Sequence, residues 1–203
     1  MNGDFHSAVD PEEGPGRAIE VLPLLCALSI KMLQYPRAGD AEAIRDVIEF
    51  ARDQPFPSPF AEDLSHIHDA FGDGAWADPE ERMAEYTRLF ISDIPRPCCP
   101  PLESFYADHV LRGQAFYDTE EIFGEWGREA QEFPADHLLS QLGFLVFLSQ
   151  DSAPGKRKAL QDFSHQHLTW VRQWIQDVHK SAHWSYYSAV ATFTGDVLTM
   201  VGS

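Results

Sequence analysis

Apolar residues recur every three or four positions along most of the chain, the pattern of amphipathic helices. It predicts helices from about Arg17 to Leu33, around Ile44–Ala51, and over residues 59–71, 79–90, 102–112, 114–131 and 135–150, followed by one stripe from Leu160 to Val178 and a last helix from Trp184 to Val201. No stretch alternates between apolar and polar residues as a half-buried strand would. The predicted fold class is therefore all-α, a compact single-domain helical bundle of about eight to ten helices.

Proline and glycine mark the breaks between these helices. Three prolines fall between residues 54 and 59, glycines flank Asp73, and four prolines lie between residues 94 and 101. Proline has no backbone N–H to donate and glycine favours turns, so each of these segments is predicted to be a loop or an extended connector. Residues 1–16 are polar, acidic and rich in glycine and proline, which predicts a flexible tail ahead of a helical domain over residues 17–203.

The charge is strongly asymmetric. The 203 residues hold 32 acidic and 15 basic side chains, a formal net charge of −17, and 14 Phe, 5 Trp and 6 Tyr provide material for a large core. The last fifty residues have five basic and three acidic side chains, so the excess of acid lies ahead of them. Such a surface repels phosphate backbones and excludes general nucleic-acid binding, whereas it favours partners with a basic end.

The sequence contains no recognisable export signal. Its N-terminal segment lacks a basic region followed by an apolar one, no segment approaches the ~18 uninterrupted apolar residues of a membrane span, and its three cysteines form no disulfide framework. We expect a cytoplasmic protein that does not insert into membranes.

Motifs for catalysis are equally scarce. No glycine-rich nucleotide-binding motif or nucleophile elbow is present, and the adjacent Cys98 and Cys99 lack the spacing of a metal or redox pair. His179 and His183 have the spacing of one helix face, but a predicted helix break separates them. The sequence therefore predicts neither an enzyme nor a bound cofactor or metal.

One segment is unusually acidic. Between Asp118 and Asp136 seven acidic residues face a single basic one, Arg128, with Trp126 and Phe133 among them. The composition of the segment favours a solvated helix face, and the alternative is an acidic rim beside an apolar groove.

Four motifs occur in a fixed order. They are Tyr86-Thr87-Arg88-Leu89-Phe90, then Pro100-Pro101-Leu102-Glu103-Ser104-Phe105-Tyr106, then Pro134-Ala135-Asp136-His137-Leu138, and finally Phe163 with His167, Leu168 and Trp170. Together they span about residues 80–190 and resemble the TorD/DmsD/NarJ family, cytoplasmic chaperones for molybdenum enzymes of the dimethyl-sulfoxide-reductase type. Leu102 replaces an aromatic residue that the family usually has, and Ser92 a glycine.

The resemblance implies a system-specific chaperone. Its partner would be the apo catalytic subunit of a molybdenum oxidoreductase, whose leader or N-terminal segment it would hold for cofactor insertion, assembly or export. A leader has a basic end and an apolar stretch, which an acidic, partly apolar site would receive. By this resemblance the binding residues are Tyr86, Leu89, Phe90, Pro101, Glu103, Tyr106, Asp118, Trp126, Pro134, Asp136 and His137.

Several alternatives stay open from the sequence. Glu103, Asp118 or Asp136 would meet a leader arginine, but Asp136 is equally placed to be a helix N-cap, and His137 to be its orienting partner or a pH-sensitive contact. The aromatic side chains fit a core as well as a groove, and Phe163, His167, Trp170 and Trp174 are predicted to be core. A helical metal- or nucleotide-dependent enzyme and a general acidic adaptor are the rival functions. A monomer is expected, with domain-swapped dimers as the alternative.

Overall fold

The computed structural model describes residues 15–37, 39–72, 78–92, 97–150 and 154–201. Within these ranges the elements are α1 (Pro15–Leu33), α2 (Asp40–Arg52), α3 (Phe60–Gly72), α4 (Pro79–Tyr86), the π-helical turn η2 (Thr87–Ile91), α5 (Glu103–Ala107), α6 (Gln114–Glu125), α7 (Leu138–Ser149), α8 (Pro154–His167), α9 (Val171–Ser181) and α10 (Ser185–Val201). Ten α-helices and no strand confirm the predicted all-α bundle for the described residues. Residues 1–14, most of the predicted acidic tail, lie outside them.

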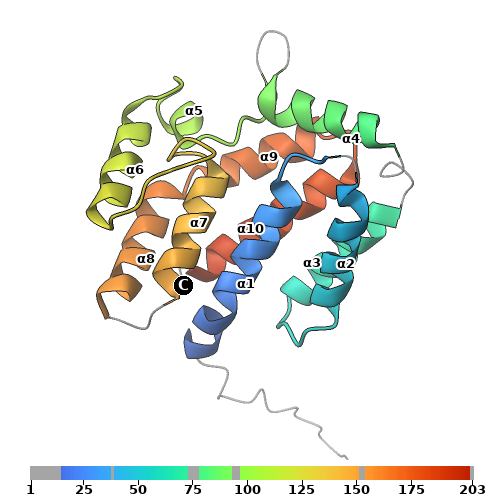
Figure 1. Cartoon of the computed structure of the whole chain (residues 1–203), viewed down its shortest axis with the longest axis horizontal. Helices are drawn as coiled ribbons and strands as arrows, with labels where there is room; N and C mark the ends of the chain where they lie inside the picture. Colours follow the sequence, from blue (N-terminus) through green and yellow to red (C-terminus); the bar gives the residue numbers. More distant parts are fainter. Residues whose placement is uncertain (1–14, 38, 73–77, 93–96, 151–153, 202–203) are drawn as a thin grey trace, which may run out of the picture.

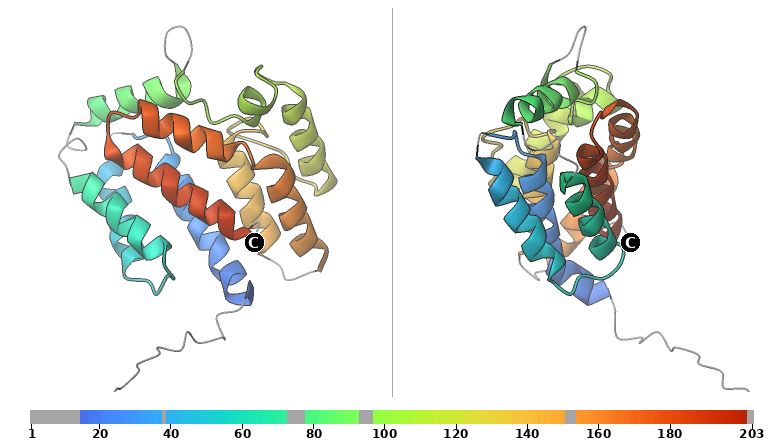
Figure 2. Two further views of the ribbon diagram at one scale, coloured as in Figure 1. Left: turned by 180° about the vertical axis from the view of Figure 1, so that it is seen from behind. Right: turned by 90° about the vertical axis from the view of Figure 1, so that its right-hand side faces the viewer.

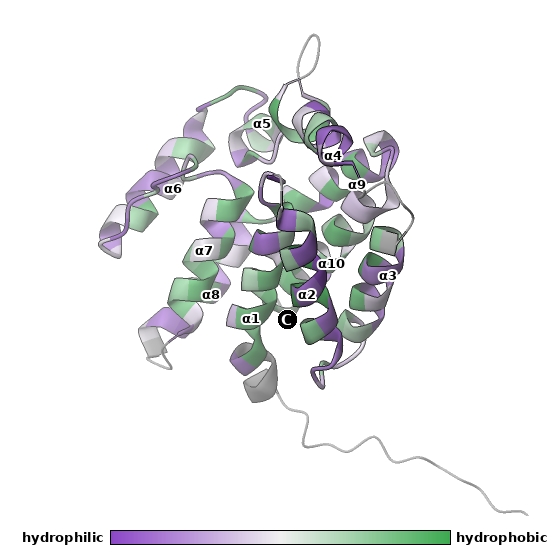
Figure 3. Cartoon of the chain, turned by 45° about the vertical axis from the view of Figure 1, so that its right-hand side comes forward, coloured by the Kyte–Doolittle hydropathy of each residue, from purple (hydrophilic) through white to green (hydrophobic). Residues whose placement is uncertain are grey.

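Helices α1 and α10 form the centre of the bundle (Figure 1). Helix α1 packs mainly against α7 and α10, and α10 packs in addition against α3 and α9. Helices α2 and α3 cover one side, α5, α6 and α8 lie on the other, and α9 and α4 run across one end, as the views from behind and from the side also show (Figure 2). Figure 3 shows α1 largely hydrophobic and α2 largely hydrophilic, as expected for a central and a peripheral helix.

Two tyrosine hydroxyls join neighbouring helices to the end of α1. The last carbonyls of a helix lack partners within it. The hydroxyl of Tyr186 donates to the carbonyl of Met32 at 3.1 Å, and that of Tyr86 donates to the carbonyl of Leu33 at 2.9 Å. Both tyrosines are buried. The carboxyl end of α1 therefore orients both α10 and α4.

The start of α4 is capped by a side chain. Asp78 is the N-cap, its side chain accepts from the backbone N–H of Glu80 at 2.8 Å, and Pro79 is the first helical residue. Further on, the helix widens into η2, which ends at Ile91. Arg88 of η2 donates to the Glu85 carboxylate at 2.8 and 2.9 Å and to the carbonyl of Ser181 at 2.6 Å. The hydrogen bond to Ser181 fastens η2 to the end of α9, and the ion pair with Glu85 orients the guanidinium for it.

The single helix predicted from Leu160 to Val178 is wrong, because two helices, α8 and α9, share that apolar stripe. The indole of Trp170 donates to the carbonyl of His167 at 2.8 Å, which occupies a backbone acceptor that a continuous helix would use itself. Trp174 donates to the carbonyl of Cys99 at 3.2 Å. As predicted, Phe163, His167, Trp170 and Trp174 are buried.

Three other predicted helices are shorter in the structure. The helix expected over 102–112 ends at Ala107, where a turn with left-handed residues begins. The helix expected over 114–131 ends at Glu125, because Gly127 has a φ of +65° and the N–H of Arg128 donates to the carbonyl of Phe123 at 2.8 Å, which closes the helix. The helix expected over 135–150 begins at Leu138, because the residues before it pair with another segment.

The proline connector is described from Pro97 onward. The N–H of Cys99 donates to the carbonyl of Leu89 at 2.7 Å, so the chain runs back along η2. Cys99 is buried, and burial raises its pKa to about 11. Cys99 is thus a packing residue.

In the described part of the chain, no helix combines the length and hydrophobicity needed to cross a membrane.

The two tyrosine hydroxyls generate a stability prediction. Tyr86→Phe and Tyr186→Phe should each lower the free energy of unfolding by about 1 kcal/mol, because each leaves a buried carbonyl without its donor. Urea unfolding measures the change. Tyr117→Phe is the matched control, since that side chain is 57% exposed and the variant should unfold as the wild type does. Equal stability of all four proteins would contradict the prediction.

Candidate functional site

Two of the sequence motifs meet side by side at the start of α5. Leu102 and His137 form an isolated antiparallel bridge. The N–H of Glu103 donates to the carbonyl of Asp136, and the N–H of Leu138 donates to the carbonyl of Pro101, both at 2.9 Å. The PPLES and PADHL segments, more than thirty residues apart in the chain, are therefore paired through their backbones.

A buried carboxylate strengthens this junction. Oδ2 of Asp136 accepts from the N–H of Ser104 at 3.1 Å and from its hydroxyl at 2.6 Å, and Asp136 is only 1% exposed. Ser104 lies in the first turn of α5, whose N-cap residue, Leu102, has no side-chain acceptor. Asp136 thus caps a helix that precedes it in sequence. The helix that follows Asp136 in the sequence is α7, and its N-cap residue is His137.

The side chain of His137 has a separate task. Its Nδ1 accepts from the N–H of Leu139 at 3.1 Å, and its ring stacks on Phe133 with centroids 4.4 Å apart. Burial lowers the pKa of His137 to about 4, so the ring is neutral at pH 7, as an acceptor at Nδ1 requires. Adjacent Asp136 and His137 therefore have different partners, and Asp136 does not orient the imidazole.

Glu103 lies at the centre of a buried polar network between four helices. Its Oε2 accepts from Nε2 of Gln141 on α7 at 2.6 Å, and its Oε1 lies 3.1 Å from Nδ1 of His167 on α8. Thr119 on α6 lies 3.4 Å from the same carboxylate. Burial raises the pKa of Glu103, while the hydrogen bonds from His167, Gln141 and Thr119 act in the opposite direction.

Beside this network lies an acidic pocket of about 520 Å³ between α5, α6 and α8. Its lining includes five carboxylic side chains and no lysine or arginine: Glu103, Asp108, Asp118, Glu121 and Glu125. Asp118, Glu121 and Glu125 follow one face of α6, and Asp108 lies in the turn before that helix. Gln114, Gln166 and His167 add polar groups, and Ala107, Ala115 and Ile122 add apolar surface. The pocket can thus surround a cationic group with carboxylates.

Four predicted residues lie instead around a narrow apolar crevice. Tyr86, Phe90, Pro101 and His137 line it together with Leu33, Leu138, Leu139 and Trp174. Its free volume is only about 10 Å³, enough for one water molecule. In this structure the crevice is closed to any side chain of a partner.

Comparison with known proteins identifies the fold and the family. The family model of the nitrate reductase delta subunit matches residues 53–176, which is more than half of the chain. The chain belongs to this family. It is the NarJ/TorD type of redox enzyme maturation chaperone, which confirms the family predicted from the sequence.

The fold is similar to that of a solved protein. A candidate redox enzyme maturation protein from Archaeoglobus fulgidus superimposes with a TM-score of 0.57 over 90% of this chain and 94% of that chain, at 21% sequence identity. At this identity the likeness concerns the fold alone. Among curated proteins, none matches the sequence significantly.

The family match spans all the predicted binding residues, and the structure distributes them over several places. Glu103 and Asp118 line the acidic pocket, while Tyr86, Phe90, Pro101 and His137 surround the crevice. Leu89 is fully buried, Tyr106 stacks on Trp170, Trp126 packs on Phe147, and Pro134 is exposed. Sequence reasoning did not select Glu121 and Glu125, although their helical spacing from Asp118 indicates a shared face. For Asp108 no local signal exists.

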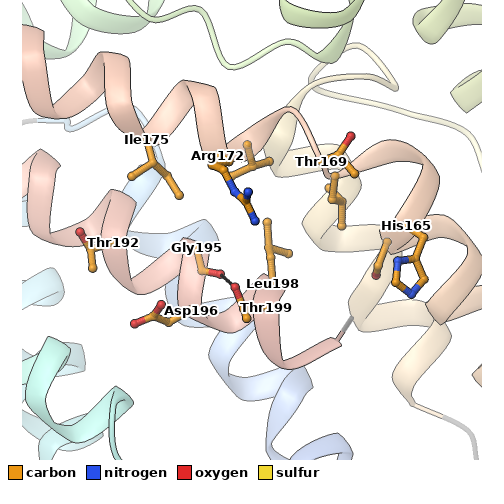
Figure 4. A pocket seen from close by; sticks show the side chains of 12 residues that line it. His165, Thr169, Arg172, Ile175, Thr192, Gly195, Asp196, Leu198 and Thr199 are labelled. Carbon is orange, nitrogen blue, oxygen red and sulfur yellow. Dashed lines mark hydrogen bonds between the residues drawn. The ribbon is translucent and has the colours of Figure 1, made fainter. Parts of the chain in front are cut away.

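A further hollow, of about 540 Å³, lies between α8, α9 and α10 (Figure 4). Arg172 and Asp196 line it together with threonines 169, 192 and 199, and none of the predicted binding residues does. Because one guanidinium accompanies one carboxylate, this hollow lacks the acidic surplus of the pocket beside α6.

Within the described ranges, no group of three His, Cys, Asp or Glu residues is placed to hold a metal ion.

Capping by Asp136 leads to a testable expectation. Asp136→Ala should lower the free energy of unfolding by about 3 kcal/mol, because the buried N–H and hydroxyl of Ser104 lose their acceptor. Asp136→Asn keeps one acceptor oxygen and should lose less. Asp118→Ala, a change at a half-exposed site, should have little effect. Urea unfolding measures all three, and a wild-type stability of Asp136→Ala would overturn the assigned role.

The depressed pKa of His137 leads to a pH dependence. The unfolded chain takes up a proton near pH 6.5, and the folded chain does so only near pH 4, so this residue's stabilising contribution decreases as the pH falls between these values. The loss should be on the order of 3 kcal/mol. His137→Asn keeps an N-cap acceptor but cannot titrate.

The measurement is the difference in unfolding free energy between wild type and His137→Asn from pH 7 to pH 4. That difference should shrink as the pH falls. Burial and the neighbouring carboxylate of Asp196 raise the pKa of Asp63 to about 6. This effect on stability has the opposite sign, but both proteins share it, so it cancels in the difference. Parallel pH profiles of the two proteins would contradict the prediction.

Proposed function

We propose that this chaperone binds the leader or N-terminal segment of the catalytic subunit of a dimethyl-sulfoxide-reductase-type molybdenum enzyme. It would act as a monomer in the cytoplasm and hold the apo subunit for cofactor insertion, assembly or export. The observation that supports this most directly is the acidic pocket, which is lined by five carboxylic side chains and by no lysine or arginine.

The chemistry of a leader segment matches this pocket. A leader begins with basic residues and continues with an apolar run. Guanidinium groups form paired, charge-assisted hydrogen bonds with carboxylates, and several carboxylates around one cavity accept them without requiring a unique pose. The net charge of −17 attracts such a segment at long range and accelerates its encounter with the protein.

The surroundings of the pocket hold it open in advance. Asp136 fixes the start of α5, and the network around Glu103 ties α5 to α7 and also to α6 and α8, the two helices that line the pocket together with α5. A site whose walls are already ordered loses little conformational entropy when a peptide enters. In this proposal Glu103 and Asp136 are positioning residues, while Asp118, Glu121 and Glu125 meet the peptide.

The closed crevice has a supporting part in the same proposal. Tyr86 and Phe90 lie against Tyr187 with ring centroids 6.2 and 5.5 Å away, and Pro101 joins the crevice to the start of α5. These contacts make the crevice a rigid backing for the PPLES segment. The predicted residues of the crevice thus act through the position of α5.

The decisive experiment compares two matched charge removals. Asp118→Asn with Glu121→Gln and Glu125→Gln removes three negative charges from the pocket face of α6. Glu42→Gln with Asp46→Asn and Glu49→Gln removes three charges from exposed positions of nearly the same spacing on α2. Calorimetric titration with an N-terminal peptide of the client should show about tenfold weaker binding for the α6 variant at low salt, a smaller loss at high salt, and little change for the α2 variant.

Two results would contradict the proposal. Equal weakening by both variants would indicate a general acidic adaptor without a dedicated pocket. No binding by the folded wild type to the peptide of any candidate client would reject leader binding altogether.

A further inference from the structure

Exposed hydrophobic side chains concentrate beside the acidic pocket. Val110, Leu111 and Tyr117 are 54%, 67% and 57% exposed, all within eight residues between α5 and the first turn of α6. The other large hydrophobic side chains found exposed in the described ranges are scattered over α1, the residues after it, α2 and η2: Leu24, Tyr35, Phe50 and Ile91. Single exposed apolar residues are ordinary, whereas a local group of them marks an interaction surface.

The backbone that presents this group is held in place. His109 and Arg112 lie on either side of Val110 and Leu111 and have φ values of +58° and +55°. Residues other than glycine rarely adopt this backbone conformation. Oδ2 of Asp108 accepts from the N–H of Ala115 at 2.9 Å and so caps α6, whose N-cap, Gly113, has no side chain. A Cβ at Gly113 would overlap Asp108. We name residues 108–113 the apolar turn.

The apolar turn is continuous with the acidic pocket. Asp108 precedes Val110 and Leu111 in the sequence and Gln114 follows them, and both Asp108 and Gln114 line the pocket. Val110 follows Asp108 by two residues and therefore lies within about 7 Å of it along the chain. Arg112, the basic residue of the turn, lies over the ring of Phe116 at 5.4 Å, which is itself buried. Carboxylates and exposed aliphatic side chains thus adjoin each other at one rim.

We propose that the apolar turn is the second half of the peptide site and receives the apolar run of the client's leader, while the basic end of that leader occupies the acidic pocket. This rests on the proposed function and specifies it. The charge of the pocket selects the basic end, and the strained turn keeps Val110 and Leu111 exposed until the apolar run covers them. The occupant is thus a peptide in which a basic pair adjoins an apolar stretch.

The test uses the full-length protein and two synthetic peptides. One peptide has two adjacent arginines followed by a run of leucine and alanine, and the other has serine and glycine in place of that run. The variant is Val110→Ser with Leu111→Ser. Phe50→Ser is the matched control, because Phe50 is 60% exposed on α2, on the other side of the bundle (Figure 1). Unchanged urea midpoints verify that all proteins are folded.

We expect the turn variant to bind the leucine peptide about tenfold more weakly than the wild type does, because the aliphatic surface that would be buried is gone. It should bind the serine peptide as the wild type does, and Phe50→Ser should change neither affinity. Wild-type affinity of the turn variant for the leucine peptide would overturn the inference, and so would equal losses for both peptides, which would mean that the turn acts only by shaping the pocket.

The failure of the inference can be distinguished from the failure of the proposed function. If the turn variant binds normally while removal of charge from Asp118, Glu121 and Glu125 abolishes binding, the acidic pocket remains the leader site and only the apolar turn is rejected. If the wild type binds neither peptide, both proposals are rejected.

Discussion

The carboxylate of Asp136 holds together the region on which the candidate site depends. Its oxygen accepts two hydrogen bonds from Ser104 across 32 residues of sequence, at the start of a helix of only five residues. Such a short helix has little stability of its own, because nucleation costs more than one turn of hydrogen bonds returns. A buried, charged acceptor at its first turn compensates for that cost, since hydrogen bonds to charged groups contribute about 1.5–3 kcal/mol. Together with the backbone bridge between Leu102 and His137, it fixes the start of α5.

The position of α5 in turn decides where Glu103 lies. This side chain is 4% exposed, and a carboxylate can be buried there only because Gln141 and His167 approach it from two other helices. Removing Gln141 or His167 takes a hydrogen-bond donor away from this buried carboxylate, so each partner stabilises the network. Four helices are therefore held in one arrangement, and the pocket beside them has ordered walls.

Acidity alone does not make a binding site in this protein. The chain has 32 acidic side chains, and exposed ones such as Glu42, Asp46 and Glu49 on α2 lie on a solvated helix face, where charges interact weakly with their surroundings. The pocket differs because one face of α6 and the turn before it direct their carboxylates toward the same cavity as the buried Glu103. In the same place the apolar turn supplies exposed aliphatic surface. In the proposed function this combination receives a segment with a basic end and an apolar run, because charge directs the encounter and apolar burial supplies affinity.

The hydrophobic pattern of the sequence was sufficient to predict the all-α fold and most of the helices, because helix periodicity depends on contacts and hydrogen bonds within about four residues. The pattern did not predict the end of α8, where the indole of Trp170 donates to a backbone carbonyl. It also predicted a helix over residues 108–112, which form a turn with two left-handed residues. The four motifs identified the family and contain Glu103. Asp118 belongs to the acidic segment between the second and third motifs, and the helical spacing of Glu121 and Glu125 from Asp118 was readable there.

Tertiary structure decided the roles of these residues. Sequence offered Asp136 as a cap of the helix that follows it or as a contact for arginine, whereas the fold makes it the cap of the helix that precedes it. Likewise, only the fold brings Asp108 beside the carboxylates of α6, and Glu103 within 3.1 Å of a histidine 64 residues away. Local periodicity states which face of a helix is polar, but which polar faces converge depends on how distant helices pack, and that is settled by contacts between residues far apart in the chain.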